Sequence, residues 1–107
     1  MDIPQITIDG KVYKMPKKPK MNIFGCLVEF EDKQKTGEIQ GQEILTELCN
    51  VVSVAFNNED VTGELVEANL DFEELIDVFV YINKYVKGIY DKKIAQLPKN
   101  VIAPAKI

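Results

Sequence analysis

QEILTELCNVVSVAF, residues 42–56, carries the clearest helical pattern in this sequence. Its apolar side chains recur at spacings of three and four residues and cover one continuous side of a helix, while Glu43, Glu47 and Asn50 lie on the other side. A helix with one apolar side has to bury that side against other elements. We therefore take residues 42–56 as the central helix of a packed domain.

A longer helix is predicted over about residues 71–97. Asp71 with Glu74 three residues later has the layout of a capping box, and Pro98 ends the helical pattern. Acidic residues at its start and lysines at its end complement the helix dipole. Its main apolar stripe holds Phe72, Leu75, Ile76, Phe79, Ile82, Val86 and Tyr90. Val78, Tyr85 and Ile89 widen the stripe to about half of the circumference, and Tyr81 lies just beyond it.

A third helix is expected over about residues 21–34, before the central one. Gly25 within it weakens the helix by about 1 kcal/mol relative to alanine, and its small size would allow another element to approach closely. Residues 35–41 are predicted to form a loop. Residues 59–70, after the central helix, are predicted to hold one short helical turn.

The N-terminal residues 3–15 predict a β-hairpin. Asp9-Gly10 suits a two-residue type I′ turn, in which both central residues have positive φ. That register places Ile6, Ile8 and Tyr13 on one face of the hairpin, with Thr7 and Val12 on the other. Because a lone two-stranded ribbon is marginally stable in water, its apolar face should pack on the helices or pair with another chain.

These elements predict an α+β, mainly α fold, in which the hairpin packs on a bundle of about three helices. We expect one domain over residues 1–97 and an extended tail over residues 98–107, which contain two prolines. The connector between hairpin and helices is basic, with Lys17, Lys18 and Lys20 beside two prolines. It is either a solvated loop or a strip that docks on an acidic surface.

The composition argues against catalysis and against nucleic-acid binding. Among the 107 residues there is no histidine, the usual general base and the commonest metal ligand, and no common catalytic motif. All 13 cations are lysines and the net charge is −4, which disfavours a nucleic-acid partner. We therefore expect no enzyme, no cofactor and no bound metal.

Hydropathy and cysteine content suggest a cytoplasmic protein. No apolar run approaches the roughly 18 residues that cross a membrane, and the N-terminus lacks the pattern of a signal peptide. Cys26 and Cys49 lie among apolar residues at helical spacing. We expect both to be free thiols that fill space in the core.

The charges are segregated along the chain. Residues 36–80 contain eleven acidic residues and no lysine, whereas residues 1–20 and 81–107 are basic. Two interpretations are open. Acidic helix ends could lie beside basic ones within the fold, or the two kinds of surface could serve head-to-tail self-association or the docking of a basic partner.

The wide apolar arc of the helix over residues 71–97 also has two interpretations. Val78, Tyr81, Tyr85 and Ile89 could form a protein-binding surface, since such surfaces are rich in aromatic residues. Alternatively, the hairpin could lie over this side of the helix and cover it.

The order of these elements resembles a known family. The hairpin ITIDGKVY at residues 6–13 leads through Lys17-Lys18-Pro19-Lys20 into a helix that ends near Glu29-Phe30-Glu31, and the last helix opens with LDFEEL at residues 70–75. Over about residues 4–96 the chain looks like the tail assembly chaperones of siphophages and related prophages of low-GC Gram-positive bacteria.

That resemblance implies a non-catalytic function without a cofactor. Such chaperones coat the long helical tape measure protein, keep it soluble and recruit the major tail protein, which forms the tail tube. The family also implies self-association, and a short form whose C-terminus is extended by ribosomal frameshifting. Two other functions remain open from the sequence: a structural tail completion protein of the virion, and a small acidic regulatory inhibitor or antitoxin.

Overall fold

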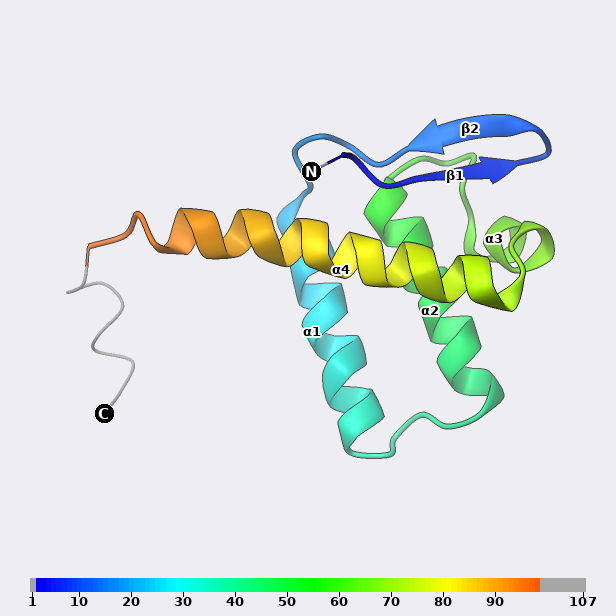
Figure 1. The fold of residues 1–107 in the computed structure, drawn as a ribbon. Helices are drawn as coiled ribbons and strands as arrows, with labels where there is room; N and C mark the ends of the chain where they lie inside the picture. The colour runs from blue at the N-terminus through cyan, green and yellow to red at the C-terminus, as the bar shows by residue number, and fades with distance from the viewer. Residues whose placement is uncertain (1, 99–107) are drawn as a thin grey trace.

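Two strands and four helices make up residues 2–98, the part of the chain that the computed structural model describes (Figure 1). They are β1 (Gln5–Ile8), β2 (Lys11–Lys14), α1 (Met21–Lys35), α2 (Gln42–Phe56), α3 (Gly63–Asn69) and α4 (Phe72–Ile94). The α+β, mainly α class predicted from the sequence is confirmed. Apart from Pro98, the predicted extended tail over residues 98–107 lies outside the described residues.

Helix α2 is the centre of the packing, as its sequence pattern indicates. It contacts α1, α3 and α4, and α4 crosses both α1 and α2 on one side of the pair (Figure 1). The predicted bounds of α2 are confirmed, and Asn57 ends the helix in the left-handed conformation that suits asparagine. Its buried side chains are Leu48, Cys49, Val51, Val52, Ala55 and Phe56.

Helix α4 begins where the capping box predicts. The Asp71 carboxylate accepts a hydrogen bond from the Glu74 N–H at 2.8 Å, and the Glu74 carboxylate accepts one from the Asp71 N–H at 2.9 Å. The helix ends at Ile94, three residues before the predicted end. The Leu97 N–H donates to the Ile94 carbonyl in a tighter turn, and Pro98 disfavours helical backbone at the residue before it.

Helix α3 is longer than the single turn predicted for residues 59–70. The Thr62 hydroxyl caps its N-terminus by accepting a hydrogen bond from the Leu65 N–H at 3.2 Å. Val61 and Val66 are buried on either side of this cap. Because both valines join the common core, tertiary packing stabilises a helix of seven residues that local propensity alone would not support.

The hairpin has the predicted turn and register. Asp9 and Gly10 take φ values of +50° and +79°, as a type I′ turn requires. The strands pair Gln5 with Lys14, Ile6 with Tyr13, Thr7 with Val12 and Ile8 with Lys11. Ile6 and Ile8 are buried in the core, whereas Thr7 and Val12 face solvent. The Asp9 N–H also donates to the Asn69 side chain at 3.4 Å, which ties the turn to α3.

Gly25 does not mark a close approach between elements. No heavy atom lies within 4 Å of the position that a Cβ would occupy there, apart from the glycine's own neighbours. The expectation of close packing at Gly25 was therefore wrong, and the residue acts on the helix only through its backbone freedom.

Gly25→Ala should raise the free energy of unfolding by about 0.5–1 kcal/mol, because alanine reduces the backbone entropy of the unfolded chain and its methyl group meets open space. Gly10→Ala is the matched control. It should lower the free energy of unfolding, since the φ of +79° is strained for alanine. Urea titration followed by circular dichroism measures both, and a loss of stability in Gly25→Ala would contradict the open space described above.

Candidate protein-binding surfaces

The hairpin and its connector cover one side of α4. The Tyr81 hydroxyl donates to the backbone carbonyl of Asp2, and the Tyr85 hydroxyl donates to the carbonyl of Lys17 at 3.0 Å. Because a tyrosine ring is rigid, these two bonds hold both ends of the covering segment against the helix. The segment before β1 and the connector after β2 are thus fixed to the same stretch of α4.

The apolar residues predicted as a protein-binding surface lie on this covered side. Val78 and Tyr85 are only 7% and 9% exposed, and Ile89 is partly buried against the core. Tyr81 keeps a partly exposed ring. These four residues therefore do not form one open surface, and the structure favours the alternative in which the hairpin covers them. The sequence left both interpretations open because both sides of the helix are apolar.

The predicted basic strip remains accessible. The residues Lys17, Lys18 and Lys20 are all exposed, although the Lys17 carbonyl is held by Tyr85. No ion pair joins these three lysines to another residue in the described part of the chain. The connector thus presents its charge outward from a fixed backbone.

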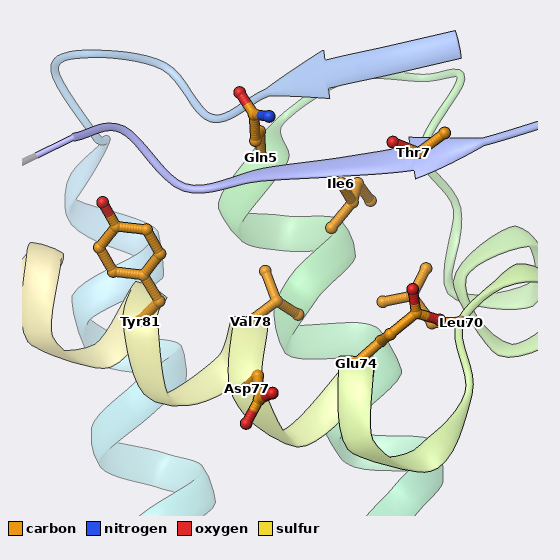
Figure 2. A pocket seen from close by; sticks show the side chains of 8 residues that line it. All are labelled: Gln5, Ile6, Thr7, Leu70, Glu74, Asp77, Val78 and Tyr81. Atoms are coloured by element: carbon orange, nitrogen blue, oxygen red, sulfur yellow. The ribbon is translucent and has the colours of Figure 1, made fainter. Parts of the chain in front are cut away.

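A groove separates β1 from α4 (Figure 2). It has a volume of about 340 Å³, and Ile6 from β1 and Val78 from α4 point toward one another inside it (Figure 2). The lining residues are Gln5, Ile6, Thr7, Leu70, Glu74, Asp77, Val78 and Tyr81. A second hollow of about 650 Å³ shares Gln5 and Tyr81 with the first and extends past Ile3 toward Lys14 and Lys17. The two hollows adjoin along β1, with Glu74 and Asp77 at one end and Lys14, Lys17 and Asp2 at the other.

The backbone of β1 on the groove side has no partner within the described residues. Ile8 and Lys11 flank the two-residue turn and exchange both backbone hydrogen bonds. Hydrogen-bonded and non-hydrogen-bonded pairs alternate along the ladder, so Thr7 and Gln5 belong to non-hydrogen-bonded pairs. Their N–H and C=O groups therefore point away from β2. Since β2 lies on the far side of β1 from α4 (Figure 2), these groups lie on the edge of β1 that borders the groove. No hydrogen bond from another described residue satisfies them.

The opposite side of α4 is apolar and open. Phe72, which the sequence places in the main apolar stripe, is 65% exposed and therefore lies outside the core. Ile76 is partly buried and Val80 is 43% exposed. At spacings of i, i+4 and i+8 the three form one continuous strip, which we call the α4 strip. Tyr90, the last residue of that apolar stripe, is 41% exposed and stacks on Phe24 with ring centroids 4.1 Å apart.

The acidic residues of residues 36–80 form no ion pair with a lysine in the described part of the chain. All three ion pairs in residues 2–98 use carboxylates of α1: Glu29 with Lys33, and Glu31 with both Lys35 and Lys87. None uses an acidic residue from residues 36–80. The interpretation in which acidic helix ends lie beside basic ones within the fold does not require ion pairs, so it stays a prediction alongside the docking alternative.

The ionisable side chains show few perturbed pKa values. A hydrogen bond from Lys87, 2.7 Å from the carboxylate, lowers the pKa of Glu31, and the charge of Lys87 acts in the same direction. Burial raises the pKa of Cys26, followed by the charge of Glu29, and burial also raises the pKa of Cys49. A raised pKa leaves less thiolate at neutral pH. Cys49 is a buried free thiol, as expected.

Neither metal-ligand clusters nor membrane-crossing helices occur in residues 2–98. No group of three or more histidine, cysteine, aspartate or glutamate residues there is arranged to hold a metal ion. None of the helices in this range combines the length and the hydropathy that crossing a membrane requires. No protein family, no curated protein and no solved structure matches this chain.

Tyr85→Phe should lower the free energy of unfolding by about 0.5–1.5 kcal/mol, because it removes the hydrogen bond to the Lys17 carbonyl and keeps the buried ring. Tyr90→Phe is the matched control, since no hydrogen bond of its hydroxyl group occurs within the described residues. Urea titration of both variants measures the difference. Equal stability of the two variants would mean that the bond to Lys17 contributes nothing to holding the connector.

Proposed function

We propose that this protein is a tail assembly chaperone of a long-tailed bacteriophage, acting without catalysis in the cytoplasm of the host cell. It binds the tape measure protein and recruits subunits of the major tail protein. The order of the elements and the ITIDGKVY and LDFEEL segments supply the family resemblance. The observation that carries the proposal physically is the open α4 strip.

The α4 strip suits a helical partner. Phe72, Ile76 and Val80 line up along two turns of α4, which is the pattern that packs against a second helix. Glu73 and Asp77 follow the strip along one margin at the same helical spacing, with Lys84 further on. A long helical protein kept soluble before assembly would expose an apolar face, and an apolar strip with charged margins covers such a face reversibly.

The unpaired acidic residues support a second candidate function. The eleven acidic residues of residues 36–80 form no ion pair within the described chain and remain available to a basic protein. An inhibitor or antitoxin that caps a basic target would use that surface. In the chaperone proposal the same surface serves self-association with the basic part of a second copy.

Replacing the α4 strip should abolish capture of the tape measure protein. In the double variant Phe72→Ser with Val80→Asp, affinity for a helical tape measure fragment should fall about a hundredfold, since two apolar contacts of about 1.5 kcal/mol each are lost. Co-expression pull-down followed by calorimetric titration measures the loss. Because both side chains are exposed, circular dichroism should show an unchanged fold.

Met21→Asp is the control for that experiment. Met21 is 91% exposed but lies at the start of α1, outside the α4 strip, and an acidic residue there suits the helix N-terminus. It should capture the fragment like the parent. Normal capture by the folded double variant would remove the strip from the proposal, and capture lost equally in Met21→Asp would show a nonspecific effect of added charge.

The chaperone and the structural interpretation differ in whether the protein stays in the finished virus. An assembly chaperone leaves once the tail tube covers the tape measure protein, so mass spectrometry of purified virions should find no peptides of this chain. Infected-cell lysate should contain them, which controls for expression. Stoichiometric peptides in virions would instead establish a structural tail protein.

A further inference from the structure

The outer edge of β1 is built to accept another strand. The N–H and C=O groups of Gln5 and Thr7 lie on the edge away from β2, which borders the groove, and have no partner within the described residues. An unpaired strand edge is a template for strand addition, and the groove below it has an apolar floor of Ile6 and Val78. From Ile3 to Thr7 the edge extends about 13 Å, so it fits an extended segment of five residues.

The charges of the groove define the occupant and its direction. Glu74 and Asp77 lie at the Thr7 end, whereas two lysines, Lys14 and Lys17, lie with the single acidic residue Asp2 toward the Ile3 end. An added strand therefore has its positive charge beside Thr7. The side chains of the added strand that lie over Ile6 and Val78 should be apolar. β-branched residues would suit the strand, because they favour extended backbone.

The chain itself contains such a segment at residues 99–103, Lys-Asn-Val-Ile-Ala, outside the described residues. Val101 and Ile102 are β-branched, and Lys99 provides the positive charge at one end. Pro104 lacks an N–H and limits the pairing segment to the five residues that the edge accommodates. Laid antiparallel to β1, this segment brings Lys99 beside Glu74 and Asp77 and away from Lys14 and Lys17.

The segment cannot reach the groove of its own copy. Val78 lies 16 residues before Ile94, which places the two about 24 Å apart along α4. Residues 95–98 continue past the last turn of α4, away from the hairpin (Figure 1). The four steps from Pro98 to Ile102 span at most about 14 Å. The strand therefore has to come from a second copy.

We propose that residues 99–103 of one copy add antiparallel to β1 of another copy as a third strand. Because the donor segment and the acceptor groove are different surfaces, each copy gives one segment and receives one, and the contact is head-to-tail. The inference stands on the groove and the sequence of the tail, and it does not require the assembly role proposed above.

Two full-length variants test the proposal. Thr7→Pro removes an N–H on the free edge of β1, which takes no part in pairing with β2. Val12→Pro is its matched control, since Val12 is the pairing partner of Thr7 and its N–H points to the opposite edge of the hairpin. The donor variant, Val101→Asp with Ile102→Asp, changes only residues beyond the described fold.

Size-exclusion chromatography with light scattering, over a range of protein concentrations, is the measurement. The parent and Val12→Pro should grow above the monomer mass as concentration rises, while Thr7→Pro and the donor variant should each stay monomeric. An equimolar mixture of these two should form a dimer of twice the monomer mass, since one keeps its tail and the other keeps its groove. A monomeric parent, unchanged association in either variant, or a monomeric mixture would each overturn the proposal.

A synthetic peptide of residues 99–107 provides a test that does not depend on how Thr7→Pro folds. Added in excess to the parent protein, it should return the mass to that of the monomer by filling the groove. The same peptide with aspartate in place of Val101 and Ile102 should have no effect. Failure of the first peptide to dissociate the parent, or equal action of both peptides, would overturn the proposal.

Discussion

The apolar face of a two-stranded ribbon is the constraint on which the rest of this structure depends. Such a ribbon is marginally stable in water, so Ile6 and Ile8 have to be covered by helices. In this fold α4 shares that task, and the hydroxyl groups of Tyr81 and Tyr85 hold the flanking segments in place. Covering the hairpin uses one side of α4 and leaves the other side, with Phe72 and Val80, open to solvent.

Local rules predicted the elements of this chain well. The Asp9-Gly10 turn sets the hairpin register within four residues, the Asp71–Glu74 box sets the start of α4, and helical spacing alone gives the bounds of α2. Each of these depends on interactions between residues close in sequence, so no knowledge of the tertiary structure is needed.

The surfaces could not be predicted in the same way. Apolar residues cover more than half of α4, and periodicity does not tell which margin the hairpin will cover. Val78 and Tyr85 are buried and Phe72 is exposed because of where a segment some 70 residues away packs. The groove was missed for a related reason, since Gln5 and Thr7 have an open edge only because β1, and not β2, lies next to α4. Strand pairing alone gives no information on that choice.

The two open surfaces would suit different kinds of partner. The β1 edge offers backbone hydrogen bonds in a groove, which favours an extended segment, whereas the α4 strip offers side chains at helical spacing, which favours a helix. They lie on opposite sides of α4, with the hairpin over one and solvent over the other. A copy could therefore be linked to its neighbour through β1 while its α4 strip holds a helical partner. Strips repeated along linked copies would bind a long helix through many weak contacts, and the affinity of the assembly would then exceed that of any single copy.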